Sequence, residues 1–204
     1  DLGGYPGDKM YVLPNGIDVT RFIPLAVPDK IRLRAELGIA PDVPVLLFFG
    51  RKQAVKGFDL FLATIDALRA KTPNLVAIAI GPTPANTCND PDFTERCALQ
   101  AKLTTEGILQ DFGPMPHADI ARYLQVADIA ILPSRDEPQG MAMIEAMAAG
   151  LIVVSGDVGG IRESIHNGVD GLLVETTGAQ NNVLPAVSRV LNDLELYRGM
   201  GSNA

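Results

Sequence analysis

The stretch Val43–Ala70, VPVLLFFGRKQAVKGFDLFLATIDALRA, decides the fold class. It opens with an unbroken apolar run, Val45–Phe49, which is typical of a strand buried on both faces. After a basic loop, apolar residues recur at steps of three and four from Phe58 to Leu68, the period of an amphipathic helix. A buried strand followed by a helix is the repeating half of a βαβ unit, and such units build parallel sheets.

The same alternation continues along the chain in both directions. Further strand-like runs are Met10–Leu13, Leu75–Ile80, Ile108–Phe112, Ile129–Leu132, Ile152–Ser155 and Leu172–Val174. Segments with helical period are Ile31–Leu37, Phe93–Leu103, Ile120–Val126, Met141–Ala149, Ile161–His166 and Val183–Leu196. We therefore predict an α/β fold with a doubly wound, mostly parallel Rossmann-like sheet and helices on both faces. Ligands of such sheets bind in loops at the carboxyl ends of the strands.

Length and charge narrow the possible classes of protein. A chain of 204 residues is long enough to bury one real core, so we expect a single domain over residues 1–204. The net charge of −7 argues against binding to nucleic acid, which needs concentrated Lys and Arg. No apolar run approaches the roughly 20 residues of a membrane span, so we expect no transmembrane segment.

The start of the chain and its cysteines bear on context. The chain opens at Asp1 without an initiator Met and without a signal peptide. We expect residues 1–9 to be a flexible lead-in from a missing N-terminal domain, and the protein to be cytoplasmic. Cys88 and Cys97 have no second pair or nearby His to complete a metal site, so we expect two reduced thiols and no metal.

The first loop that could bind a ligand is Gly50–Gly57, which follows the strand Val45–Phe49. It carries three cations and no anion, an unusual concentration in an acidic chain. Arg51 leaves the strand end and Lys56 precedes the next helix, so both can face the crevice above the sheet. Arg offers a planar fork to phosphate oxygens and Lys a mobile point charge, which suits a diphosphate. A solvated basic loop is the alternative.

The second loop is Pro133–Gly140, which leads into a helix that we expect to end at Gly150. Gly140 lets a ligand approach the free amide groups of the first helical turn, where the helix dipole favours an anion. Glu137 and Glu145 flank this position and suit sugar hydroxyl groups on either side of a diphosphate. The spacing alone is equally compatible with a loop acid and an ordinary helix residue.

Other phosphate and catalytic motifs do not occur in the sequence. No Gly-x-Gly-x-x-Gly follows the early strands, and the basic loop lacks the Gly-Lys-Ser/Thr of a P-loop. There is also no Gly-x-Ser-x-Gly nucleophile elbow. His117 and His166 have no Ser, Cys or Asp arranged for a triad, and we interpret both as structural or solvated.

Taken in order, the motifs resemble the retaining GT-B glycosyltransferases with the Glu-x7-Glu signature, known as glycosyltransferase family 4 or glycosyl transferases group 1. The matching strings are Pro14-Asn15-Gly16-Ile17-Asp18, Gly50-Arg51 with Lys56-Gly57, Glu137-x7-Glu145 with Ala146-Met147-Ala148-Ala149-Gly150, Val158-Gly159-Gly160, and Asn167-Gly168 with Gly171-Leu172. Beyond Val174 the resemblance weakens, and position 138 is Pro where many members have Gly.

The resemblance implies the donor-binding, Rossmann-like half of a two-domain GT-B enzyme, without a cofactor or a metal. Its donor would be a nucleoside diphosphate hexose that is UDP-, GDP- or ADP-linked, and its acceptor would bind mainly to the missing N-terminal domain. Arg51 and Lys56 match residues that hold the diphosphate and stabilise charge developing on it. Glu137 matches the residue that contacts the transferred sugar. This half alone would be inactive.

The remaining implied contacts are to the nucleoside and the phosphates. Glu145 matches the residue that binds the ribose, and Met115 would meet the base through its backbone. The amide groups of Gly140, Met141 and Ala142 would meet the phosphate. Three alternatives stay open: a non-catalytic nucleotide-sugar-binding module, a GT-B sugar-nucleotide epimerase, and a glycoside hydrolase that uses Glu137 and Glu145 as its acid pair.

Overall fold

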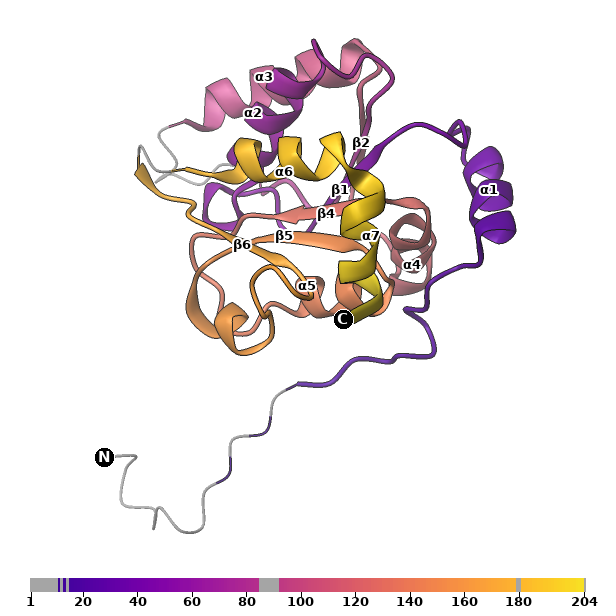
Figure 1. Cartoon of the computed structure of the whole chain (residues 1–204). Coiled ribbons are helices and arrows are strands. Elements are labelled where there is room, and N and C mark those ends of the chain that lie inside the picture. The colour runs from indigo at the N-terminus through magenta and orange to yellow at the C-terminus, as the bar shows by residue number, and fades with distance from the viewer. Residues whose placement is uncertain (1–10, 12, 14, 85–91, 179–180, 204) are drawn as a thin grey trace.

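The computed structural model describes residues 11, 13, 15–84, 92–178 and 181–203 and shows a six-stranded sheet in the order β3-β2-β1-β4-β5-β6 (Figure 1). All neighbouring strands are parallel. The strands are β1 (Val45–Phe49), β2 (Val76–Ile80), β3 (Leu109–Phe112), β4 (Ile129–Leu132), β5 (Ile152–Gly156) and β6 (Leu172–Val174). This arrangement confirms the predicted doubly wound, Rossmann-like fold.

Helices cover both faces of the sheet (Figure 1). The α-helices are α1 (Val27–Glu36), α2 (Phe58–Leu68), α3 (Phe93–Thr105), α4 (His117–Val126), α5 (Met141–Ala148), α6 (Val183–Asn192) and α7 (Leu194–Asn203), and the 3₁₀ helices are η2 (Ala54–Lys56) and η3 (Gly159–Glu163). Helices α2, α3 and α6 pack on one face with Leu46 and Phe48, while α4 and α5 pack on the other with Leu47 and Phe49. Successive residues of β1 therefore belong to different cores, which explains its unbroken apolar sequence.

The strand order places the two candidate loops next to each other. From β1 the chain steps outward to β2 and β3, then returns to β4, which pairs with β1 on its other side. The loops that follow β1 and β4 therefore diverge from neighbouring strands, at the point where the strand order reverses. A crevice at that point is where open α/β sheets bind ligands.

Three predicted elements differ in the structure. The strand expected at Met10–Leu13 is wrong where it can be seen, because Tyr11 and Leu13 are unpaired and more than 80% exposed (83% and 86%). Met10 and Val12 lie outside the described residues. Apolar composition alone predicted this strand, but the Tyr11 and Leu13 side chains cover no buried surface.

The other two differences concern helices. The helix expected at Ile161–His166 is the 3₁₀ helix η3, which ends at Glu163, and the amide group of His166 donates to the Asp170 side chain instead of continuing a helix. The helix expected at Val183–Leu196 is divided at Asp193 into α6 and α7. The Asp193 side chain accepts a hydrogen bond from the amide group of Leu196, so it favours a new helix start.

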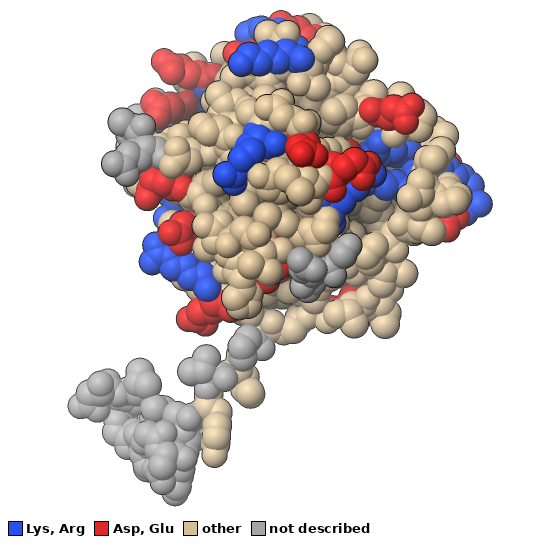
Figure 2. Space-filling model, in the orientation of Figure 1, with Lys and Arg blue, Asp and Glu red and all other residues tan. Residues whose placement is uncertain are grey.

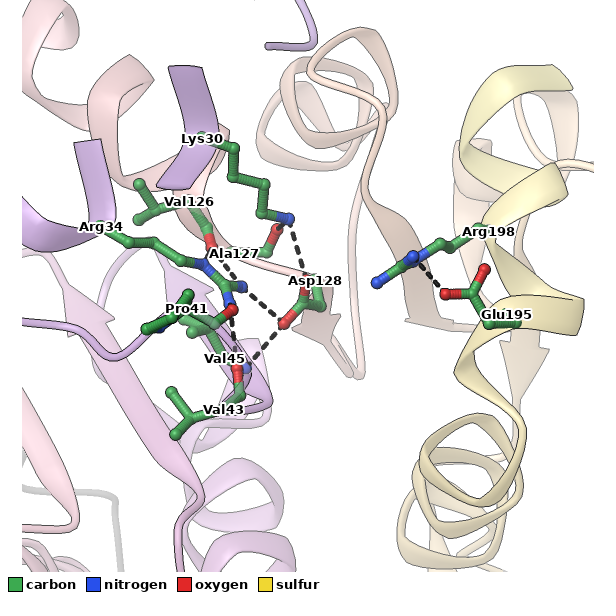
Figure 3. Close-up of polar contacts among 10 residues, drawn as sticks. All are labelled: Lys30, Arg34, Pro41, Val43, Val45, Val126, Ala127, Asp128, Glu195 and Arg198. Carbon is green, nitrogen blue, oxygen red and sulfur yellow. Dashed lines mark hydrogen bonds and ion pairs between the residues drawn. The ribbon is translucent and has the colours of Figure 1, made fainter. Parts of the chain in front are cut away.

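A buried ionic cluster joins α1 to the amino-terminal edge of the sheet (Figure 3). The Asp128 carboxylate accepts hydrogen bonds from Lys30, from Arg34 and from the amide group of Val45, at 2.8–2.9 Å. Arg34 is 4% exposed and also donates to backbone carbonyl groups before β1 and β4. The edge opposite the two candidate loops is thereby held by a charge cluster whose groups satisfy one another.

Charged side chains on the surface are interspersed. On the face that Figure 2 shows, Lys and Arg alternate with Asp and Glu in small groups between large neutral areas. No broad basic area is visible on this face. Across the described residues, no helix is both long and apolar enough to cross a membrane.

Candidate functional site

The loop after β1 reaches the loop after β4 because Gly57 allows a close contact. Gly57 ends η2 and precedes α2 in the left-handed conformation, with φ of 71°. A Cβ atom at this position would lie 2.0 Å from the carbonyl oxygen of Pro133. Only glycine meets both conditions without a shift of the backbone, so this residue brings Lys56 against the second loop.

Two further glycines hold the second loop from its other side. Cβ atoms at Gly159 and Gly160 would lie 2.1 Å and 2.0 Å from the carbonyl oxygens of Glu137 and Pro138. The amide group of Gly160 donates to the carbonyl of Glu137 at 3.2 Å. The backbone around Glu137 is therefore packed against the start of η3, so the Glu137 side chain extends from a backbone that is fixed in position.

A cavity of about 70 Å³ lies between the two loops, at the carboxyl ends of β1, β4 and β5. Its polar lining includes Lys56, Glu137 and Ser134, and Gly140 borders it at the N-terminus of α5. The Lys56 ammonium group donates to the Glu137 carboxylate at 2.7 Å, with each side chain about one-fifth exposed (19% and 20%). Their spacing in the sequence predicted both residues at the site but not their contact with each other.

The structure brings some of the predicted site residues together and leaves others apart. Lys56, Glu137, Gly140 and Ala142 line the cavity. Arg51 is exposed beside it, and its side chain makes no hydrogen bond or ion pair with another described residue. Met141 is half-buried at the start of α5.

Met115 lines a separate cleft of about 200 Å³ with residues of α4. Met115 follows β3, which lies on the other side of β1 from β4 and its loop. The predicted base contact is therefore at the carboxyl edge of the same sheet, two strands away from β1.

Glu145 lies within α5 and is 7% exposed. Burial raises the pKa of its carboxyl group above its ordinary value, although the nearby side chains of His117 and Arg21 act in the opposite direction. The Nδ1 atom of His117 is 3.6 Å from the Glu145 carboxylate, and its ring meets Phe22 edge-on, with 6.5 Å between centroids. Glu145 thus contacts the start of α4, and His117, which the sequence indicated to be structural or solvated, is a largely exposed side chain with contacts to Glu145 and Phe22.

Two contacts at the site had no signal in the sequence. The Gln139 side chain exchanges hydrogen bonds with Asn15, whose Nδ2 donates at 2.7 Å and whose carbonyl accepts at 2.9 Å. The segment before α1 therefore touches the loop before α5, across 124 residues of sequence. Lys52, the third cation of the basic loop, is buried and pairs with Asp111 instead of facing the crevice.

Potential metal ligands do not cluster in the part of the chain that the structure describes. Within the described residues, no three or more His, Cys, Asp and Glu side chains gather in a group that could hold a metal ion. Cys97 is a free thiol, and Cys88 lies outside the described residues.

The fold and the two facing loops define a class of protein. It is a Rossmann-like α/β domain with a crevice, suited to an anionic ligand, at the point where the strand order reverses. The family model described as Glycosyl transferases group 1 matches residues 29–204. The chain therefore belongs to this family, as its motifs indicated.

Two relatives show the extent of the similarity in sequence. The chain is 32% identical to the D-inositol 3-phosphate glycosyltransferase of Nocardia farcinica, over all of this chain and 44% of the relative. It is 36% identical to the protein of the same name from Geodermatophilus obscurus, over 82% of this chain and 37% of the relative. The chain thus spans less than half the length of these glycosyltransferases.

Solved structures agree with the fold. Anabaena HepE, determined in complex with UDP and glucose, is 26% identical with a TM-score of 0.78, covering 98% of this chain and 52% of HepE. Sucrose-phosphate synthase of Thermosynechococcus elongatus is 29% identical with a TM-score of 0.74, covering 93% of this chain and 45% of the synthase. The chain matches about half of each, as expected for one Rossmann-like half of a GT-B fold.

Proposed function

We propose that this chain is the donor-binding domain of a retaining glycosyltransferase. In this proposal it binds a nucleoside diphosphate hexose, which is transferred to a carbohydrate, lipid or small-molecule acceptor held mainly by an N-terminal domain. The observation that carries the proposal is the cavity between the loops after β1 and β4, where Lys56 and Glu137 meet beside the N-terminus of α5.

The chemistry follows from the charges around this cavity. When the bond between the sugar and the diphosphate breaks, negative charge builds up on the leaving diphosphate. In this proposal, Lys56, the exposed Arg51 and the amide groups of Gly140, Met141 and Ala142 stabilise that charge. These groups supply leaving-group assistance from the protein alone, so we expect no metal requirement.

The Lys56–Glu137 ion pair prepares the site for the donor. Without donor, the carboxylate holds the ammonium group at the cavity, so a flexible side chain needs less ordering when a phosphate arrives. With donor bound, Lys56 is shared with a phosphate oxygen, and Glu137 becomes free to accept hydrogen bonds from sugar hydroxyl groups.

Glu145 and the backbone of Met115 would hold the ribose and the base. HepE was solved with UDP and glucose, which supports a UDP-linked hexose as one candidate donor; GDP and ADP sugars are the others. A cytoplasmic location and the inactivity of this domain alone also stay predictions.

Titration calorimetry with UDP, GDP and ADP tests the proposal. We expect one of them to bind, and Arg51→Ala and Lys56→Ala to weaken that binding about 10- to 100-fold, because each removes a charge-assisted contact of about 1.5–3 kcal/mol. Lys71→Ala removes an exposed cation elsewhere and serves as the matched control. The proposal would be refuted if the folded protein bound none of the three nucleoside diphosphates and none of the corresponding nucleoside diphosphate sugars.

Assays on the full-length protein that carries this chain separate the alternatives. Transfer of the hexose with retained anomeric configuration supports the proposal. Interconversion of nucleotide sugars without an acceptor would identify an epimerase, and donor binding without turnover by the full-length protein would identify a binding module. Hydrolysis of an aryl glycoside without nucleotide would identify a hydrolase.

A further inference from the structure

Lys52 is a deeply buried cation at the carboxyl edge of the sheet, and the proposed function does not use it. Its side chain is 1% exposed. The ammonium group is paired with the Asp111 carboxylate and donates to the carbonyl of Phe112 at 2.6 Å. A buried lysine is costly unless such partners accept its hydrogen bonds, so this side chain is held in one position.

This contact links the ends of three neighbouring strands. Lys52 follows β1, its amide group donates to the carbonyl of Pro82 after β2 at 3.0 Å, and its side chain reaches the last residues of β3. The amide group of Gly81 also donates to the carbonyl of Phe112, at 3.2 Å. The backbone after β3 is therefore tied to the basic loop that begins at Arg51.

In the segment after this tie, Gly113–Met115, the carbonyl of Gly113 accepts a hydrogen bond from the amide group of Gly81 at 3.3 Å, whereas the backbone groups of Met115 are free among the described residues. Neither the amide nor the carbonyl group of Met115 makes a hydrogen bond with another described residue. Backbone groups in a fixed direction can read the hydrogen-bonding edge of a planar base, whereas groups on a loose loop lose that discrimination.

We propose that Lys52 is a positioning residue for base recognition. By holding the Phe112 carbonyl, it fixes the direction of the backbone groups that meet the nucleobase, while Arg51, the preceding residue, meets the diphosphate. This inference rests on the proposed function. According to this inference, Lys52 contributes to the part of the donor affinity that depends on the base. It does not contribute to the part that depends on the diphosphate.

Asp111→Asn tests this assignment with a small change. The variant keeps the shape of the side chain but removes the charge that holds the Lys52 ammonium group. We expect the affinity for the preferred nucleoside diphosphate to fall about tenfold, while the affinity for inorganic pyrophosphate changes less than about twofold. The preference among UDP, GDP and ADP should narrow as well.

Asp128→Asn is the matched control. Asp128 likewise accepts from a buried cation, Arg34, but it lies at the opposite edge of the sheet (Figure 3). We expect this variant to lower stability while leaving the ratio of nucleotide to pyrophosphate affinity unchanged. If the loss of any buried ion pair had this effect, the ratio of nucleotide to pyrophosphate affinity would change equally in both variants.

A double variant guards against poor folding. Lys52→Met with Asp111→Leu replaces the ion pair by apolar side chains of similar size, which proteins often tolerate without loss of stability. It still loses the hydrogen bond to Phe112, so the same selective loss of nucleotide affinity is expected.

Equal losses for nucleotide and pyrophosphate in Asp111→Asn, or the same selective loss in Asp128→Asn, would overturn the assignment. If the unaltered chain binds pyrophosphate but no nucleoside diphosphate, the proposed function itself fails, and that result is visible before any variant is made.

Discussion

At the scale of single residues, the Glu145 carboxyl group combines a cost to stability with a proposed role in binding. It is buried in α5, and its pKa is raised because burial outweighs the favourable charges of His117 and Arg21. A raised pKa means that the folded state holds this proton more tightly than the unfolded chain. Stability therefore falls as pH rises from the ordinary pKa of a glutamate through the raised one.

Glu145→Gln should remove this pH dependence. At neutral pH we expect the variant to be more stable than the unaltered chain, because a neutral amide is cheaper to bury than a carboxylate. The difference should shrink toward zero below the ordinary pKa of glutamate, where both proteins carry a neutral group. Urea unfolding at a series of pH values measures it.

The same variant should bind nucleotide less well. A ribose contact to a carboxylate is stronger than one to an amide, so we expect about 10-fold weaker binding of the preferred nucleoside diphosphate. Glu95→Gln changes an exposed glutamate in α3 and should alter neither property. The account would be contradicted if the stability of Glu145→Gln, compared with that of the unaltered chain, were lower at neutral pH than at acid pH.

At the scale of elements, glycines decide how closely the two loops approach. Gly57 and Gly38 share the same left-handed φ of 71°, but only Gly57 faces a neighbour, since no heavy atom lies within 4 Å of a Cβ built at Gly38. The two positions therefore separate backbone strain from the close contact between loops.

Gly57→Ala should destabilise the protein more than Gly38→Ala. Both substitutions incur the left-handed strain of about 1–2 kcal/mol, and Gly57→Ala adds a collision with the Pro133 carbonyl. We expect a difference of about 2 kcal/mol or more in the free energy of unfolding in urea, with nucleotide binding weakened only by Gly57→Ala. Equal costs at the two positions would show that the loops adjust without difficulty.

At the scale of the whole molecule, ligand binding should appear as added stability. A ligand at about 100 times its dissociation constant stabilises the folded state by about 2.7 kcal/mol. For a chain of this size each kcal/mol raises Tm by roughly 2–4 °C, so the preferred nucleotide should raise Tm by about 5–10 °C. Differential scanning fluorimetry with UDP, GDP and ADP would identify the preferred base of the nucleotide. The free nucleosides serve as control and show how much of the rise in Tm comes from the diphosphate. An equal shift with nucleoside alone would place the affinity outside the diphosphate site.

The sequence by itself determined the fold class and the two loops. Buried parallel strands require unbroken apolar runs, and the runs at Val45–Phe49 and Ile129–Leu132 are visible without coordinates. Lys56, Glu137 and Gly140 stand in loops that follow such strands, so their place at the carboxyl edge was predictable. The run at Met10–Leu13 shows the limit, because composition does not reveal whether a buried partner exists.

Tertiary structure alone decided which of these charges meet. Lys52 and Lys56 are four residues apart in one basic loop, yet Lys52 is buried against Asp111 and Lys56 lines the cavity with Glu137. Their partners are 59 and 81 residues away. Local sequence holds no information on such contacts, because strand order and the close approach of loops at glycines set the direction of each side chain. The reversal of strand order between β1 and β4 is therefore what converts two separate motifs into one candidate site.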